Sequence, residues 1–216
     1  MNIDFARLQM VNQQVRGWNV YDEDVLAMLR QLPRERFVPE GYESLAFADM
    51  ELPIGHAERM MTPTIEGRLL QALGLEGDEK VLEIGTGSGF MTACLASLAA
   101  KVTSIDIHAD FLSTAEARLA AHDLDNIELV QMDAMREIPE GGFDAIAVTG
   151  SIQSFDPRFV EALNPYGRLF VVVGDAPAME ARLVERTDGK DWHSVSLFET
   201  TLAPLVHGAL PPQFSF

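Results

Sequence analysis

The sequence predicts an α/β protein in which a doubly wound, mostly parallel sheet of seven strands follows a helical N-terminal extension. From residue 80 onward, short apolar runs alternate with stretches of helical periodicity, the order expected of a parallel sheet with crossover helices. The apolar runs are nearly continuous, as in strands that are buried on both faces. Near the C-terminus, two strand-like runs flank Asp188-Gly189, which predicts an antiparallel hairpin.

The first third of the chain predicts helices. Apolar residues at near-helical spacing indicate one helix over residues 3–16 and a second over 22–31, with Asp22 as the N-cap of the second. Residues 33–61 contain three prolines and are expected to be irregular. Thr62-Pro63 then opens another helix, with Thr62 as N-cap and the proline at the first helical position, where it is tolerated.

The rest of the chain supplies the sheet. The expected strands are residues 80–84, 102–106, 127–132, 143–149 and 168–173, followed by the hairpin strands 181–186 and 192–202. The C-terminal segment Pro211–Phe216 carries two aromatic residues, and we expect it to dock on the body of the protein. We divide the chain into an extension with the substrate loop, residues 1–61, and an α/β cofactor-binding domain, residues 62–216, which together form one compact unit.

The stretch Val81 to Gly89 carries the strongest functional signal. A strand that ends at Glu83-Ile84 is followed at once by glycines at 85, 87 and 89 and then by a helical pattern. A strand, a glycine turn and a helix together form a nucleotide-binding edge. Position 90 is Phe90, so the dinucleotide fingerprint G-x-G-x-x-G is absent. The loop is either a cofactor loop of another type or a glycine turn without a ligand.

Two further acids lie at the ends of predicted strands. Asp106 lies 21 positions after Gly85, close to the ~20-residue separation of a carboxylate that accepts hydrogen bonds from ribose hydroxyls. The alternative is an acid at the end of a strand that caps the next helix. Asp133 follows the third strand, and it either contacts a nucleotide base or forms a turn.

Composition limits the possible partners and compartments. The formal net charge of −17 argues against nucleic acid or an anionic membrane as the main partner. The single cysteine, Cys94, is expected to be a buried core thiol, and the five scattered histidines show no metal-ligand spacing, so no metal site is predicted. Neither a transmembrane run nor a signal pattern is recognised. We therefore expect a cytoplasmic protein.

The order of the motifs resembles the protein-L-isoaspartate O-methyltransferases over almost the whole chain. The segments that carry this resemblance are Leu32-Pro-Arg-Glu-Arg-Phe-Val-Pro39, Ala46-Phe-Ala-Asp49, Leu52-Pro-Ile-Gly55, Glu83-Ile-Gly-Thr-Gly-Ser-Gly89, Leu163-Asn-Pro-Tyr-Gly-Arg-Leu169 and Leu202-Ala-Pro-Leu205. The glycine segment is common to S-adenosylmethionine-dependent methyltransferases in general. The Pro-Arg-Glu-x-Phe-Val-Pro and Leu-Pro-Ile-Gly segments are more specific to this family.

The resemblance implies the seven-stranded methyltransferase fold, a monomer, and methyl transfer from S-adenosylmethionine to the isoaspartyl carboxylate of a damaged protein. It also implies the cofactor-binding residues, namely Glu83, Gly85, Thr86, Gly87, Ser88, Gly89, Asp106, Asp133 and Thr149. Thr149 alternatively satisfies a backbone group at the end of its strand. A carboxylate acceptor is ionised at neutral pH because its pKa is near ~4, so no catalytic residue is assigned. The protein must instead align the reacting groups and exclude water.

One segment departs from the family. After Pro-Ile-Gly the family has Gly-Gln-Thr-Ile-Ser-x-Pro two residues on, a loop whose hydroxyls hold the substrate carboxylate. Here Glu58 stands at the glutamine, Arg59 at the threonine and Met61 at the serine, and Thr62 follows. A thioether donates no hydrogen bond. Arg59 and Thr62 could bind the carboxylate instead, or Met60 and Met61 could line an apolar pocket for another acceptor.

Each of these residues also has a purely structural interpretation. Thr62 could be only a helix cap, Arg59 could pair with a surface carboxylate, and the methionines could be core. Two other functions therefore remain open, namely a methyltransferase with a different acceptor and a non-catalytic module that binds S-adenosylmethionine. A nicotinamide dehydrogenase is disfavoured by the missing fingerprint.

Overall fold

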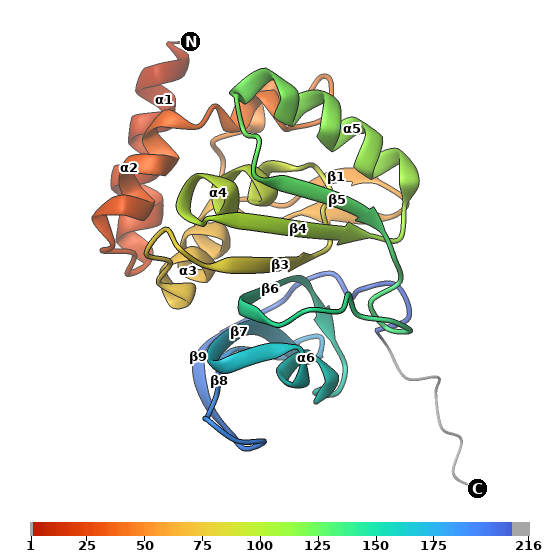
Figure 1. Ribbon diagram of the computed structural model, residues 1–216. Helices are drawn as coiled ribbons and strands as arrows, with labels where there is room; N and C mark the ends of the chain where they lie inside the picture. Colours follow the sequence, from red (N-terminus) through yellow and green to blue (C-terminus); the bar gives the residue numbers. More distant parts are fainter. Residues whose placement is uncertain (1, 209–216) are drawn as a thin grey trace, which may run out of the picture.

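The computed structural model describes residues 2–208, and Figure 1 shows its seven-stranded sheet in the order β5-β4-β3-β6-β7-β8-β9. The strands are β3 (Lys80–Ile84), β4 (Lys101–Asp106), β5 (Ile127–Gln131), β6 (Phe143–Ile152), β7 (Leu163–Asp175), β8 (Ala178–Arg186) and β9 (Trp192–Thr200). Strands β3 to β7 pair in parallel, whereas β8 is antiparallel to both β7 and β9. The predicted fold class and its C-terminal hairpin are confirmed.

The helices also follow the predicted order. They are α1 (Ile3–Gln9), α2 (Glu23–Gln31), α3 (Pro63–Leu73), α4 (Phe90–Leu98), α5 (Ala109–Leu119) and α6 (Arg158–Glu161). The expected helix over 3–16 begins as α1, continues as a π-helical stretch, Met10–Val15, and ends in a 3-10 turn, Arg16–Trp18. Asp22 and Thr62 cap α2 and α3 as predicted, because their side chains accept hydrogen bonds from backbone N–H groups of the first turn. The Pro211–Phe216 segment, expected to dock on the body, lies outside the described residues.

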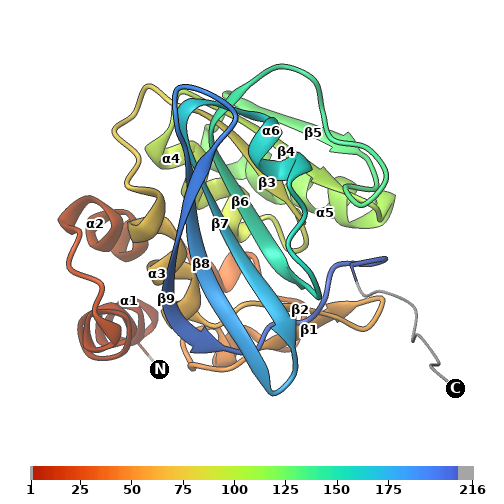
Figure 2. The same cartoon turned by 90° about the horizontal axis from the view of Figure 1, so that it is seen from below.

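Alternating residues of the strands face two different cores. Val81, Val102 and Phe170 pack with the N-terminal helices, α3 and α4, whereas Leu82, Ile105 and Leu169 pack with α6 and the segment after β5. Figures 1 and 2 show most of the helices on one side of the sheet and the short α6 on the other. The sheet is thus covered on both faces, as its apolar strands require. Cys94 is buried in the first core, as predicted.

A two-stranded hairpin lies within the stretch that the sequence predicts to be irregular. It consists of β1 (Leu52–Gly55) and β2 (Glu58–Met60), which pair antiparallel. The turn places His56 and Ala57 in the left-handed region, with φ of 50° and 65°. Pattern reasoning misses this hairpin because its strands are very short, one contains Pro53, and the turn lacks the usual Asn-Gly signal.

The buried guanidinium of Arg34 fastens this hairpin to the domain. It pairs with Glu66 of α3 (Nε–Oε2 2.9 Å), and both side chains are at most 2% exposed. The same guanidinium donates to the carbonyl oxygens of Ala46 (2.5 Å) and Met61 (2.7 Å), and it lies over the ring of Phe90 at the start of α4. One side chain therefore joins the extension, the segment after β2, α3 and α4.

Replacing Arg34 with methionine should destabilise the protein by about 3–5 kcal/mol, because Glu66 is left buried and unpaired beside two carbonyls that lose a donor. Denaturant-induced unfolding measures the loss. The control Arg16→Met removes an exposed ion pair with Glu23 and should cost at most about 1 kcal/mol. Equal losses in the two variants would contradict the assigned role of Arg34.

Candidate cofactor and acceptor site

A pocket opens at the carboxyl ends of the parallel strands. It lies at β3, whose neighbours in the sheet are β4 on one side and β6 on the other. Ligands of open α/β sheets bind at such a switch point. About 840 Å³ of empty space lies between the walls of the pocket, and part of this space is open to solvent. Its walls come from the segments after β3, β4 and β5, from β6, from the β1–β2 hairpin and from residues 203–206.

The glycine loop brings backbone close to this pocket. Gly85 has φ +102° and Gly87 φ +50°, and both line the pocket together with Thr86 and Ser88. A Cβ on Gly85 would lie 2.3 Å from Oγ1 of Thr149, and one on Gly87 would lie 3.1 Å from Ile54. A side chain at either position would crowd a neighbouring wall of the pocket, so the loop needs glycine there. Gly89 caps α4 in a left-handed conformation and does not line the pocket.

The carboxyl group of Glu83 lies behind the loop. It is fully buried and does not line the pocket, and its Oε2 accepts hydrogen bonds from the hydroxyls of Thr92 and Ser104, each at 2.5 Å. Its Oε1 is buried without a hydrogen-bond partner among the described residues. Desolvation raises the pKa of Glu83 to about 8 in spite of the two hydroxyl donors. The sequence predicts a cofactor contact for Glu83, and the structure places its side chain in a hydroxyl network that joins β3, α4 and β4.

Asp106 and Asp133 both line the pocket, as their predicted roles require. Asp106 accepts the backbone N–H of Gly87 (2.9 Å) and that of His108 (2.9 Å), so it joins the glycine loop to the start of α5. Asp133 accepts the backbone N–H of Met135 (3.0 Å), which is the turn that the alternative interpretation expects. The other oxygen of Asp133 lies 2.9 Å from Nδ1 of His207.

Thr149 lies beside the glycine loop, near the carboxyl end of β6. Its hydroxyl is 2.9 Å from the carbonyl oxygen of Ile84 and 2.7 Å from that of Gly85. It therefore satisfies strand-end carbonyls, the alternative role expected from the sequence, and it also lines the pocket. The structure brings Thr149 of β6, Asp106 at the end of β4 and Asp133 after β5 to one cavity.

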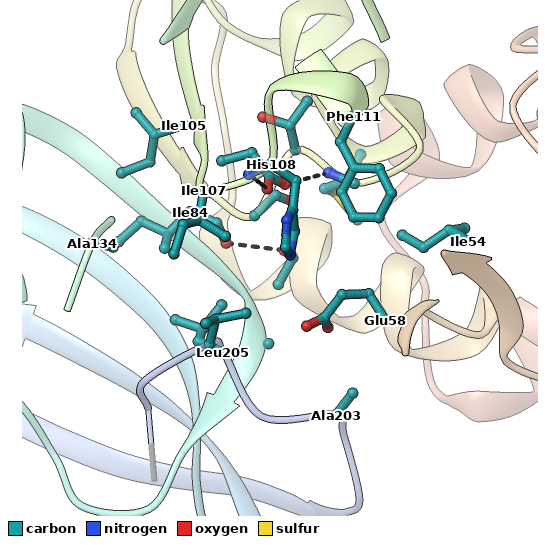
Figure 3. Close-up of a pocket in the computed structure, with 18 of the residues that line it drawn as sticks. Ile54, Glu58, Ile84, Ile105, Ile107, His108, Phe111, Ala134, Ala203 and Leu205 are labelled. Carbon is teal, nitrogen blue, oxygen red and sulfur yellow. Dashed lines mark hydrogen bonds between the residues drawn. The ribbon is translucent and has the colours of Figure 1, made fainter. Parts of the chain in front are cut away.

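The β1–β2 hairpin supplies the opposite wall. Glu58, Arg59 and Met61 line the pocket, and Figure 3 shows Glu58 projecting into it. Desolvation raises the pKa of Glu58 against the opposing charge of His108. Arg59 is half exposed, with Glu51 as a distant partner at 3.9 Å, whereas Met61 is 5% exposed. Thr62 caps α3 and does not line the pocket.

Several lining residues were not assigned to the site from the sequence, although Ile54 and Leu205 lie in segments that carry the family resemblance. His108 and Phe111 come from the start of α5, Ile54 from β1, and Leu205 from the C-terminal segment, and Figure 3 shows these four around the cavity. The cofactor residues expected from the sequence are mostly acids and glycines at strand ends. Nothing in local spacing indicates that β1 or residues 203–206 fold back onto the same cavity.

A doubly wound α/β fold with this pocket defines a class of proteins that bind a nucleotide-like ligand at the carboxyl ends of the strands. The family model "Protein-L-isoaspartate(D-aspartate) O-methyltransferase (PCMT)" matches residues 7–209. Protein-L-isoaspartate O-methyltransferase 1 of Rhodopseudomonas palustris is 38% identical over 93% of this chain and 82% of the relative. The corresponding protein of Aliivibrio salmonicida is 35% identical over 95% of this chain and 98% of the relative.

The chain belongs to the protein-L-isoaspartate O-methyltransferase family. Its fold is also that of a solved Plasmodium falciparum structure described as a member of this family in complex with S-adenosyl-L-homocysteine. The TM-score of that match is 0.80 at 17% identity, over 92% of this chain and 97% of the other. In the described part of this chain, none of the helices has the length and apolar character needed to cross a bilayer.

Gly85→Ala should lower the affinity for S-adenosylmethionine, the cofactor that the sequence predicts, at least tenfold, because the new Cβ meets Thr149 and φ is unfavourable. Isothermal titration calorimetry of the folded variant measures the change. Gly189→Ala is the matched control, since a Cβ there meets no atom within 4 Å. Unchanged affinity in Gly85→Ala would show that the loop does not contact the ligand.

Glu83 should make stability fall as pH rises. Between the ordinary pKa of 4.5 and the folded-state pKa of about 8, the unfolded chain has lost a proton that the folded chain keeps. Each pH unit in this window then lowers the free energy of unfolding by up to ~1.4 kcal/mol, and the effect levels off above the folded pKa.

Glu83→Gln cannot titrate, so its stability relative to the natural chain should increase between pH 5 and pH 8. Urea unfolding at several pH values measures the difference. The control is Glu128→Gln, since Glu128 is an exposed partner of Lys101. Parallel stability curves for Glu83→Gln and the natural chain would contradict a neutral buried Glu83.

Proposed function

We propose that this chain transfers a methyl group from S-adenosylmethionine to the free carboxylate of isoaspartyl residues in proteins. The observation that carries the proposal is the pocket at the ends of β3, β4 and β6, lined by the glycine loop in a chain of this family. Four carboxylates of the described residues line this pocket: Glu66, which is paired with Arg34, and Glu58, Asp106 and Asp133, which face no buried guanidinium. The last three suit a ligand that carries positive charge, as this cofactor does.

The pocket fits the cofactor on structural grounds. Gly85 and Gly87 line the pocket without a Cβ, so their backbone can approach a ligand closely. We propose that Gly85, Thr86, Gly87 and Ser88 contact the cofactor, and that Asp106, Asp133 and Thr149 complete its site. Glu83 and Gly89 support the loop from outside the pocket. When bound, S-adenosylmethionine supplies a methyl group on a sulfonium that is already an activated leaving group.

The acceptor side of the site is the β1–β2 hairpin. A substrate carboxylate is ionised at neutral pH, so the hairpin has to bind and orient it rather than remove a proton. Arg59 lines the pocket, and among the described residues its ion-pair partner is the distant Glu51, so its guanidinium is available for a charge-assisted contact. The buried Met60 and Met61 exclude water beside it.

A second function is favoured by the same two methionines. Both are 5% exposed and line the pocket. Met61 stands where the family loop carries a serine. An apolar wall would suit a methyl acceptor other than an isoaspartyl carboxylate. This alternative keeps S-adenosylmethionine as the methyl donor and changes only the acceptor.

We further propose a protein or peptide as the substrate, with action as a monomer in the cytoplasm. The negative charge of −17 opposes nucleic acid as a partner. The lone Cys94 is buried and unpaired, in keeping with a reducing compartment. Residues 1–61 would position the substrate loop, while residues 62–216 would hold the cofactor.

Labelled methyl transfer to an isoaspartyl peptide, beside the same peptide with normal aspartate, tests the proposal. We expect base-labile label on the isoaspartyl peptide alone. Label that appears on the isoaspartyl peptide only after Met61→Ser would show that Met61 redirects the natural chain to another acceptor. Cofactor binding without transfer to any protein or peptide would indicate a binding module.

Arg59→Gln should lower kcat/KM for the isoaspartyl peptide by about 10–100-fold, which corresponds to a charged hydrogen bond of about 1.5–3 kcal/mol. The affinity for S-adenosylmethionine should change little, and calorimetry checks this. Arg16→Gln is the control, because Arg16 pairs with Glu23 on the surface away from the pocket. An unchanged kcat/KM in Arg59→Gln would exclude Arg59 as the carboxylate-binding group.

A further inference from the structure

Two imidazoles and a carboxylate meet at the rim of the pocket. His56 lies in the turn between β1 and β2, while His108 and Asp110 lie at the start of α5. One ligand atom of each residue lies within 4.8 Å of those of the other two. The sequence spacing gives no sign of this group, because the hairpin reaches α5 only in the folded chain.

The three side chains are held together by contacts of their own. The rings of His56 and His108 stack with centroids 3.9 Å apart and an interplanar angle of 11°. Phe111 packs its ring against both of them at 5.2 Å. Nε2 of His56 lies 2.8 Å from Oδ2 of Asp110. The three side chains are therefore neighbours in the folded chain, and binding an ion requires side-chain rotation but no change of the fold.

His108 has unused ligand capacity. Its Nε2 is buried and has no hydrogen-bond partner among the described residues. Glu58 is near enough to interact electrostatically with His108, and it adds negative charge to this rim. Imidazole nitrogen together with carboxylate oxygen is a donor set that suits zinc, nickel or copper rather than magnesium or calcium.

We propose that His56, His108 and Asp110 bind one divalent transition-metal ion of the zinc class. Ligand bonds of about 2.0–2.2 Å require the three donor atoms to move closer together. The side chain of His56 is 42% exposed, so its ring can turn out of the stack toward the ion. Three protein ligands leave a coordination position for water or for another ligand.

The ion would tie the β1–β2 hairpin to α5. His108 lines the cofactor pocket, and the strand that follows the His56 turn carries Glu58 and Arg59 into its opposite wall. A bond from the ion to each side of the pocket would restrict the hairpin and so control entry to the site. The metal site itself does not depend on the proposed methyltransferase activity.

Equilibrium dialysis of the full chain against Zn²⁺, with millimolar Mg²⁺ present to occupy weak acidic sites, tests the proposal. We expect one tightly held Zn²⁺ per chain. His56→Asn should weaken binding at least tenfold, and asparagine tolerates the left-handed backbone of this turn. His108→Ala provides a second variant with the same expected loss.

His193→Asn on β9 is the matched control and should bind Zn²⁺ like the natural chain. Hydrogen exchange supplies a readout that a surface ion would not change, because residues 52–60 should become more protected with Zn²⁺ in the natural chain but not in His56→Asn. Absence of stoichiometric binding, equal binding by His56→Asn and His193→Asn, or unchanged exchange of the hairpin would each overturn the proposal.

Discussion

The buried guanidinium of Arg34 is the interaction on which the site depends. Taking this charge and that of Glu66 out of water is costly, and the cost is offset only when every donor finds an acceptor. Here the acceptors are Glu66 and the carbonyls of Ala46 and Met61, so one side chain fixes where the extension, the hairpin and α3 meet. Glu35, the residue after Arg34, pairs with Arg7 of α1. The Pro-Arg-Glu segment that identifies the family in the sequence thus holds the N-terminal extension on the domain.

A second buried network, made of hydrogen bonds, supports the glycine loop from the side away from the pocket. Glu83 joins Thr92 and Ser104, and Ser104 lies 2.6 Å from the hydroxyl of Thr86 within the loop. The loop itself needs positive φ at Gly85 and Gly87, a conformation that surrounding contacts must hold in place. The carboxyl group therefore acts on the pocket through the shape of the loop, although motif spacing alone would assign it a direct contact.

The sequence predicted the sheet well because strands that are buried on both faces are almost continuously apolar. It also predicted where α2 and α3 begin, because each helix starts at a capping residue. It also placed Gly85 and Asp106 at the carboxyl ends of neighbouring strands, because the ends of parallel strands converge there, and the family resemblance added Thr149. The hairpin was missed, since three- and four-residue strands carry too little periodicity. His56 and His108 could not be paired in advance, because their contact arises only from the tertiary fold.

These observations explain how the acceptor loop can change its chemistry while the fold persists. Arg34 binds the backbone carbonyl of Met61, not its side chain, so the path of the loop does not depend on which residue stands at 61. The side chain at 61 and that of Arg59 both face the pocket, where a substitution alters what is bound and leaves the anchoring of the loop intact. A serine at 61 would keep the same carbonyl contact. Met61 also belongs to the core that packs against the N-terminal helices, so Met61→Ser costs packing as well. Once denaturant unfolding shows that the variant is folded, its acceptor preference separates a rebuilt carboxylate site from a site for a different acceptor.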